Sequence, residues 1–322
     1  MNLLPKLFGK KPICQGIVGI SFLQKGIAIA IAKFTDNKTL KLVHCEFITS
    51  KNEPDETILL GSIITKFRLF DYDCHVVLTS DKYRHINIDA PSVAEHELGD
   101  AIRWKISDLV EFAVDKAVID FYPMPPTQRA NSNKMLEVIA SPGDQINVQA
   151  DKCLKAGLQL KVIDIQEMTL RNLAMQLPEN HRGVAILRLS ELSGLIVIEK
   201  SGTIYLSRQF DTGYKNLGLD TQPFGGNKLS TLVQGNLALE IQRSLDYVES
   251  YYGIPPISCL AIIPLAEHTE NLREILTSNL GITTRILELS AIVDSEMTLD
   301  NQTLSHCAPA IGAALRHVEA TL

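Results

Sequence analysis

The sequence predicts a two-lobed α/β fold in which one unit occurs twice. The first observation is the order of segments: three β-type runs, a helix and a buried β-type run begin at residue 16, and the same order returns from residue 183. The second observation is the stretch between the copies, residues 82–166, in which helical and β-type segments alternate. We therefore expect two repeated lobes with a small α/β subdomain inserted between them.

The first copy begins with an antiparallel meander. Residues 16–21, 27–32 and 40–48 are rich in apolar side chains and are separated by short turns. Apolar residues near one face then predict a helix over 53–69. The short run 75–78 has the composition of a buried parallel strand.

The second copy repeats this order. The β-type runs 184–188, 195–200 and 203–210 form the second meander, and a long helix is expected over 229–252. Its apolar residues recur at steps of three and four, which predicts one buried stripe: Leu237, Ile241, Leu245, Val248 and Tyr252. The run 259–263 then supplies the buried strand.

The insertion is predicted to begin with a helix. Ser92 and Glu95 have the spacing of a capping box, and the helix is expected to run to Leu109. The residues expected on its inward face are Ala94, Leu98, Ala101, Ile102, Ile106 and Leu109. Two strands, a helix and a further strand are expected to follow, over 117–122, 135–140, 145–156 and 158–165.

Composition and charge exclude one class of function. Hydrophobic residues make up 45% of the chain, and 31 Lys and Arg against 37 Asp and Glu give a formal charge of −6. A mildly acidic chain without a basic cluster is a poor binder of nucleic acid, because neutralising phosphates requires concentrated Lys and Arg. The six cysteines form no CxxC pair, which predicts free thiols in a reducing compartment.

No apolar run is long enough for a membrane-spanning helix, and the first residues lack the apolar core of a signal peptide. We therefore expect a cytoplasmic protein. Residues 1–15 are expected to form a tail that contains several leucines and lysines. The tail is either disordered or in contact with an anionic membrane surface.

Three segments resemble PilM-type pilus assembly proteins. Residues 101–105, AIRWK, resemble a stretch of that family that begins AIRWE, and residues 240–247, EIQRSLDY, are similar to its EIQRSLDYY helix. Residues 308–316, APAIGAALR, are similar to its closing helix. The resemblance covers about residues 16–317 and implies the actin/Hsp70-like (ribonuclease H-like) fold. Elsewhere the chain most resembles the MshI branch, which serves the mannose-sensitive haemagglutinin (MSHA) type IV pilus.

The resemblance also implies a division into domains. The second lobe is expected over 183–307, and the inserted subdomain, of the family's 1C type, over 82–166. The first lobe is expected over 16–81, with 167–182 and a C-terminal helix at 308–317 packing near it.

Proteins of this fold bind ATP between their lobes, at two turns rich in Gly, Ser and Thr beside acidic residues. Backbone N–H groups there approach the phosphates, and a carboxylate holds the hydrated magnesium ion. In this chain Ser21 stands where the first turn of the family has Asp, and Leu23 stands where it has Gly. The second turn lacks both the Asp and the Gly of the family, and its one acidic residue, Glu191, stands at a different position in the turn. Residues 263–268 lack the glycines of the adenosine motif.

These three departures together predict a cleft that no longer needs nucleotide. We expect no cofactor, no metal ligand and no catalytic residue, with ATP and magnesium as the open alternative. The histidines form no HxxxH or HExxH pair, which agrees with the absence of a metal site. The resemblance assigns six residues to the degenerate cleft: Ser21, Gln24, Lys25, Ser190, Glu191 and Ser193.

The resemblance further implies a place on the cytoplasmic side of the inner membrane. Such proteins bind the N-terminal peptide of a PilN-like bitopic partner, here of the MshJ type, in a groove between the insertion and the first lobe. The residues implied for this contact are Ile102, Arg103, Trp104, Ile106 and Leu109. Trp104 is the only tryptophan, and we expect it to pack in the core or between lobes, with direct partner contact as the alternative.

The preferred interpretation is a non-catalytic scaffold of MSHA-type pilus assembly, peripheral to the inner membrane. The alternative is an active actin-like ATPase whose nucleotide state gates partner binding, and a more distant one is a relative of sugar or acetate kinases. The resemblance leaves the assembly ATPase and a second copy of the chain open as further partners. The first residues, MNLLP, resemble the INLLP start of PilN-like proteins, so one hypothesis places the tail in the partner groove.

Overall fold

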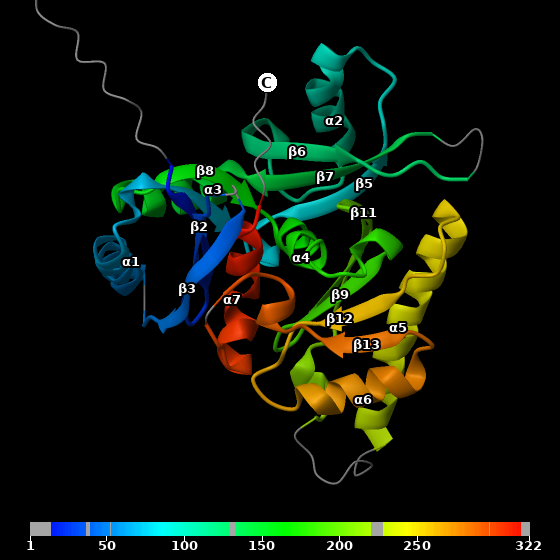
Figure 1. Cartoon of the computed structure of the whole chain (residues 1–322). Helices are drawn as coiled ribbons and strands as arrows, with labels where there is room; N and C mark the ends of the chain where they lie inside the picture. Colours follow the sequence, from blue (N-terminus) through cyan, green and yellow to red (C-terminus); the bar gives the residue numbers. More distant parts are fainter. Residues whose placement is uncertain are drawn as a thin grey trace, which may run out of the picture.

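Each lobe contains a five-stranded mixed sheet, and the two sheets are built in the same way (Figure 1). In each sheet, three antiparallel strands are joined by two parallel strands that come later in the chain. The predicted duplication is therefore confirmed. The computed structural model describes residues 14–36, 39–51, 53–128, 133–219, 228–295 and 297–316.

The strands of the first sheet are β1 (Gly16–Leu23), β2 (Gly26–Phe34), β3 (Leu40–Thr49), β4 (Tyr72–Val77) and β8 (Gln159–Asp164). Those of the second sheet are β9 (Val184–Leu189), β10 (Gly194–Lys200), β11 (Thr203–Phe210), β12 (Cys259–Ile262) and β13 (Thr283–Ile286). Their orders are β3-β2-β1-β4-β8 and β11-β10-β9-β12-β13. Because β9 and β12 are parallel, the segments that follow them lie at one edge of the second sheet.

Two helices, α4 (Gln166–Ala174) and α7 (Asn301–Ala314), lie between the sheets (Figure 1). Their buried side chains share a single apolar core with the inner faces of both sheets. Asn172 Nδ2 donates to Gly312 O at 2.9 Å and ties the two helices together. The lobes are therefore joined by a common core rather than by a linker alone.

Glycine permits backbone contact at both faces of α7. A Cβ atom on Gly312 would lie 2.2 Å from Thr169 O of α4, and one on Gly19 would lie 2.0 Å from Ala310 O of α7. Any other residue at these two positions would push a helix or a strand away, since the obstructing atoms belong to the backbone.

The outer faces of the sheets are covered by one pair of helices each. In the first lobe these are α1 (Glu53–Phe67) and α3 (Gly143–Lys155), and their side chains pack on the outward residues of β1 and β2. In the second lobe they are α5 (Lys228–Tyr252) and α6 (Thr269–Asn279). The stripe predicted for the long helix of the second copy is buried as expected. In the part of the chain that the structure describes, no helix is both long and apolar enough to cross a membrane.

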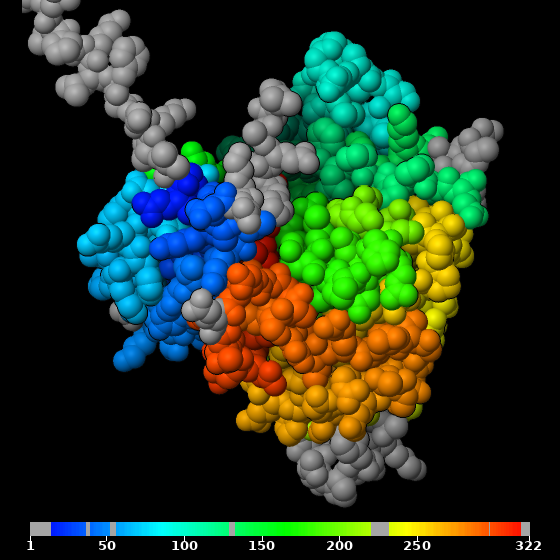
Figure 2. Space-filling model, viewed as in Figure 1, coloured from blue at the N-terminus to red at the C-terminus, as the bar shows by residue number. Residues whose placement is uncertain are grey.

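The insertion has a three-stranded sheet of its own, with α2 (Leu98–Ile106) packed on it. The strands are β5 (Arg84–Asp89), β6 (Ala117–Pro123) and β7 (Met135–Pro142), in the order β5-β7-β6. Figure 2 shows this subdomain projecting above both lobes, in teal. Short 3₁₀ helices connect the elements at Leu69–Asp71, Ser80–Lys82, Glu95–Glu97, Val114–Lys116, Asn180–Arg182, Tyr214–Leu217 and Leu289–Ala291.

The structure corrects the expected extent of the insertion, residues 82–166. Its last two elements, α3 and β8, belong to the first lobe: β8 pairs with β4 in parallel, and Cys153 of α3 and Leu158 are buried in the core of that lobe. The inserted subdomain therefore ends with β7. Residues 1–13 of the expected tail lie outside the described residues.

The structure also corrects the first helix of the insertion. The helix begins at Leu98 and ends at Ile106, although it was expected to run from residue 93 to Leu109. Ser92 and Glu95 do not form the predicted capping box, because Glu97 occupies the N-cap position of α2 and no side chain caps it. Two residues expected on the inward face, Ala94 and Leu109, are exposed.

The contact between α4 and α7 predicts a large effect of one methyl group. Gly312→Ala should lower the free energy of unfolding by about 1–3 kcal/mol, because the new Cβ atom clashes with the backbone of Thr169. Gly235→Ala is the matched control: a Cβ atom there meets nothing within 4 Å, and alanine in the exposed interior of α5 should stabilise by about 0.5–1 kcal/mol. Thermal or denaturant unfolding measures both changes, and equal stability of Gly312→Ala and the wild type would contradict the packing.

A buried carboxyl group in the second lobe predicts a pH-dependent stability. Burial raises the pKa of Glu199 from 4.5 to about 7; Gly202 N donates to its Oε2, and its Oε1 has no partner among the described residues. The folded state therefore holds a proton that the unfolded state loses, so stability falls as the pH rises from about 4.5 to about 7.

Glu199→Gln should remove this dependence. At pH 8 the variant should unfold with a free energy about 1–3 kcal/mol higher than the wild type, and near pH 4.5 the two should be equal. Denaturant titrations at a series of pH values measure the difference. The exposed Glu274→Gln serves as the control. A constant difference across the pH range would contradict the assignment.

Candidate functional site

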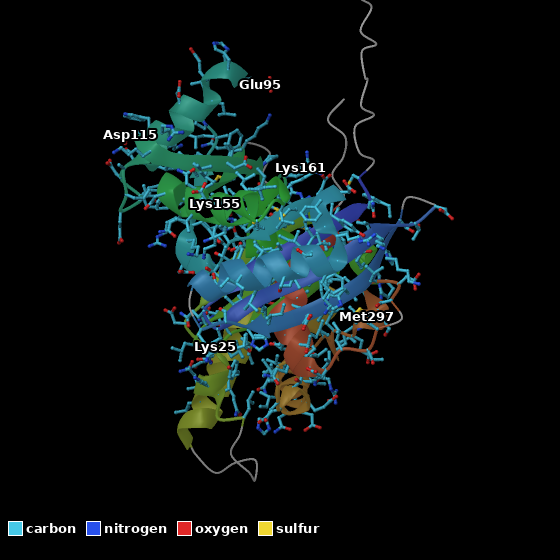
Figure 3. The ribbon with its side chains drawn as sticks, turned by 90° about the vertical axis from the view of Figure 1, so that its left-hand side faces the viewer. Lys25, Glu95, Asp115, Lys155, Lys161 and Met297 are labelled. Atoms are coloured by element: carbon cyan, nitrogen blue, oxygen red, sulfur yellow. The ribbon has the colours of Figure 1, made fainter. Side chains whose placement is uncertain are left out.

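The two turns that the resemblance assigned to nucleotide meet each other between the lobes. Lys25, in the turn between β1 and β2, reaches Glu191, in the turn between β9 and β10, with Nζ 2.9 Å from Oε1. Lys215 holds the other oxygen, with Nζ 2.7 Å from Oε2. The structure therefore brings the sequence-predicted residues of the two lobes together. We call the contact of Glu191 with Lys25 and Lys215 the turn pair, and Figure 3 shows Lys25 well away from Glu95 and Asp115 of the insertion.

The carboxylate of Glu191 is occupied by these two lysines. Hydrogen bonds from Lys215 and Lys25 lower its pKa to about 2, so it is ionised at any physiological pH. Its side chain and both lysine side chains are largely in contact with solvent, which limits what the pairs contribute to stability. A magnesium ion would have to displace two ammonium groups to use this carboxylate.

The other residues predicted for the nucleotide cleft make local contacts. Ser190 and Ser193 bond to each other, with Oγ atoms 2.7 Å apart and Ser190 N donating to Ser193 O at 2.8 Å. Ser21 is buried at the end of β1, and Gln24 is exposed in the turn beside Lys25. The second turn is closed by its own hydroxyl groups, which leaves fewer donors facing outward for a phosphate.

A buried arginine lies between the lobes, and sequence reasoning did not identify it. Arg188, at the end of β9, donates from Nη1 to Oε1 of Gln166 at the start of α4, at 2.9 Å. Its Nε has no hydrogen-bond partner among the described residues, and burial lowers the pKa of the guanidinium. The turn pair and its surroundings therefore carry three cationic side chains and one carboxylate. No group of three or more potential metal ligands occurs in the described ranges.

A separate pocket lies in the second lobe, at the segment compared with the adenosine motif. Its volume is about 720 Å³, and it is bounded by the start of α6, the segment after β13 and the start of α7. Ala266, Glu267 and His268 of the predicted segment line it. The charged lining residues are Glu267, Glu270 and Glu288, with no Lys or Arg, so a polyphosphate would be repelled there. Met297, at its rim, lies well away from Lys25 in Figure 3.

The structure divides the residues predicted for partner contact into two groups. Ile102 and Ile106 are fully buried in the core of the insertion, so their predicted role in partner contact is wrong. Arg103 is used internally, since its Nη1 donates to Val114 O and Ala117 O. Trp104 and Leu109 remain available, with 82% and 56% of their surfaces exposed. The expectation that Trp104 packs in the core or between lobes is therefore also wrong.

A polar seam fixes the insertion to the rest of the molecule, and sequence reasoning missed it. Tyr83 donates to Glu167 Oε2 of α4 at 2.6 Å, and Gln209 of β11 donates to Oε1 at 3.3 Å. His85 Nδ1 of β5 lies 3.2 Å from Ser207 Oγ of β11. The five residues come from three elements far apart in the sequence, so no local pattern could have indicated their contact.

Comparison with known proteins identifies the family. The family model for type IV pilus assembly protein PilM matches residues 72–234, about half of the chain. This stretch includes the whole insertion, α4, the meander of the second lobe and the start of α5. No curated protein matches the chain.

Solved structures show the fold. The chain is similar to the one described as the PilM-PilN type IV pilus biogenesis complex, with a TM-score of 0.71 and 17% identity over 96% of this chain and 100% of that chain. It is also similar to an actin-like ATPase fold protein of Bacteroides thetaiotaomicron (TM-score 0.48, 8% identity, 85% and 91% covered). A third is the cytoplasmic domain of EpsL from Vibrio cholerae (TM-score 0.44, 12% identity, 91% and 93% covered). The predicted actin/Hsp70-like fold class is confirmed.

The family model and the fold agree on the same parts of the molecule. The matched stretch contains the inserted subdomain and its seam with both lobes, and the structural likeness extends over nearly the whole chain. The chain therefore belongs to the type IV pilus assembly protein PilM family.

Proposed function

We propose that the chain is a non-catalytic scaffold of type IV pilus assembly that binds the cytoplasmic N-terminal peptide of a PilN-like inner-membrane protein. Membership of the PilM family and the likeness to a chain of the PilM–PilN complex support the pilus role and the partner. The observation that carries the non-catalytic assignment is the turn pair, in which Lys25 and Lys215 neutralise Glu191.

Nucleotide chemistry needs a different set of charges between the lobes. Phosphoryl transfer depends on a positioned metal ion and on carboxylates that hold it. In this chain the one carboxylate of the turn pair is bound to two ammonium groups, and the nearby Arg188 is a buried cation. This arrangement of charges supports the proposal that no magnesium–nucleotide complex is held between the lobes.

The insertion offers an edge to an extended peptide. In the order β5-β7-β6, the two outer strands have an open side, and a peptide adds to such a strand through backbone hydrogen bonds. The edge at β5 is partly used, because Lys105 Nζ donates to Asp89 O and His85 faces the second lobe. On β6, Ala117 O at the first residue accepts from Arg103 Nη1, and further along the strand Val118 and Asp120 are exposed. We therefore place the peptide on the edge of β6.

The start of β6 lies close to the first lobe. Lys116 O, just before β6, would lie 2.5 Å from a Cβ atom on Gly143, the first residue of α3. A peptide on β6 would therefore lie near the junction of insertion and first lobe that the family resemblance implies.

Within the family we assign the chain to the MshI-like branch of MSHA pili, which makes the partner MshJ-type. The sequence supports this assignment through its departures from the family's turns at Ser21 and Leu23. A cytoplasmic position at the inner membrane follows, since the proposed peptide continues into a membrane anchor. Contacts with the assembly ATPase or with a second copy of the chain would use other surfaces.

The occupied turn pair predicts weak nucleotide binding. A fluorescent ATP analogue titrated with magnesium should show no saturable binding in the micromolar range, because both oxygens of the Glu191 carboxylate are bound to lysines. Fluorescence anisotropy measures this directly. Saturable micromolar binding that is lost in Ser21→Ala or Glu191→Gln would instead establish the alternative, an actin-like ATPase.

The placement on β6 predicts which amides the partner protects. When the cytoplasmic N-terminal peptide of the PilN-like partner is added, backbone amides of β6 should exchange more slowly with solvent, because the peptide covers the open edge. Hydrogen exchange with mass spectrometry measures the protection, and a peptide of the same composition in scrambled order is the control. Protection confined to the second lobe would contradict this site.

A further inference from the structure

Trp104 is exposed on a helix whose other face is firmly buried. Its exposed fraction is 82%, the highest of any large hydrophobic side chain among the described residues. On the opposite side of α2, Ile102 and Ile106, each two residues from Trp104, are fully buried in the core of the insertion. The helix is therefore packed on the insertion without any contribution from the indole. Folding does not explain why a tryptophan is exposed at position 104, and a binding role would.

Carboxylates surround this indole. Asp100 lies one helical turn before Trp104, and Asp108 follows one turn after it, just beyond the end of α2. Both are exposed, as are Glu97 and Glu111. Residues 95–116 contain six Asp or Glu against three Lys or Arg, so this segment is more acidic than the chain as a whole.

The cations of the helix, Arg103 and Lys105, make hydrogen bonds within the insertion and, among the described residues, no ion pair with these carboxylates. Arg103 donates to Val114 O and Ala117 O, and Lys105 Nζ donates to Asp89 O at 2.7 Å. Both basic groups are thus directed to backbone carbonyls of the insertion. Within the described ranges, no ion pair involves an acidic residue between positions 95 and 115. The outer face of α2, which we define by Asp100, Trp104 and Asp108, is an exposed indole between two exposed carboxylates, in a segment whose six acidic and three basic residues give a net charge of −3.

This outer face lies at the periphery of the molecule. Figure 1 shows α2 at the outermost part of the insertion, away from both five-stranded sheets. Figure 3 shows Glu95 and Asp115 at the same end, far from Lys25 of the turn pair. The face is therefore separate from the lobes and from the turn pair, and a ligand bound to it would touch neither.

We infer that the outer face of α2 binds a Lys- and Arg-rich segment of the partner, the stretch between its N-terminal peptide and its membrane anchor. A cation placed over an indole is attracted by the ring, and Asp100 and Asp108 supply charge on either side of it. Cytoplasmic segments next to a membrane-spanning helix carry an excess of Lys and Arg, so a bitopic partner offers the matching chemistry. The inference rests on the proposed function, because it concerns the same partner.

The charge of the face argues against a lipid surface as the occupant. An exposed tryptophan can enter a membrane interface, but the inner leaflet is anionic and attracts basic segments. Asp100, Asp108, Glu97 and Glu111 would be repelled by it. The cations of a basic protein segment would be attracted both by the indole ring and by the carboxylates.

Two peptides test the inference on the full-length protein. One comprises the cytoplasmic segment of the PilN-like partner up to its membrane anchor, and the other ends before the membrane-proximal Lys and Arg residues. Calorimetric titration should show the longer peptide binding at least about tenfold more tightly, with the advantage falling as salt increases. Trp104→Ala should abolish the advantage and leave the shorter peptide unchanged, and Asp100→Asn with Asp108→Asn should reduce it and its salt dependence.

Leu232→Ala is the matched control, since Leu232 is an exposed apolar residue of α5 with 65% of its surface accessible, and it should change neither affinity. Equal binding of both peptides with no effect of Trp104→Ala would overturn the inference and leave the proposed function intact. If neither peptide binds, the proposed function fails and the inference fails with it. Trp104-dependent binding to vesicles of phosphatidylglycerol and phosphatidylethanolamine would also overturn it, in favour of a lipid surface.

Discussion

The close packing of α7 between the two lobes is the constraint on which the rest of the structure depends. Its backbone touches β1 at Gly19 and α4 through Gly312, and its side chains complete a core that both sheets share. Such contacts leave little room for one lobe to turn against the other, because close-packed interiors resist small displacements. The distance between the turns of the two lobes is therefore set by this core, and that distance lets Lys25 reach Glu191.

The charges between the lobes agree with this fixed geometry. In a fold that closes on a nucleotide, the ligand supplies charge that the two lobes then share. Here the chain supplies it, since Glu191 binds a lysine from each lobe and Arg188 binds the first residue of α4. The resulting contacts need no ligand to form. The shared core holds the lobes in one relative position, and the solvent-exposed ion pairs add little to it.

The fold could be predicted from the sequence where it depends on neighbouring residues, and less well where it depends on contacts between distant segments. Apolar periodicity revealed both meanders and the buried stripe of α5, since each depends on neighbouring residues. The assignment of α3 and β8 to the first lobe depends on parallel pairing with β4, which no local pattern encodes. In the site, the sequence identified Lys25 and Glu191 but neither their mutual contact nor the part of Lys215 in it. It also placed Trp104 inside, because residue type predicts burial and an exposed indole is an exception.

The seam of the insertion connects these features to the binding surfaces. Glu167 of α4 accepts hydrogen bonds from Tyr83, which lies just before β5, and from Gln209 of β11. The insertion is therefore bonded to the same helix that packs against α7. Tyr83 and Glu167 are buried and bonded to each other, so this contact fixes the position of the inserted sheet relative to α4. The edge of β6 and the outer face of α2 are therefore held in a constant orientation. For the scaffold role that we propose, constant orientation of these two surfaces is the physical requirement, and the hydrogen bonds of the seam supply it.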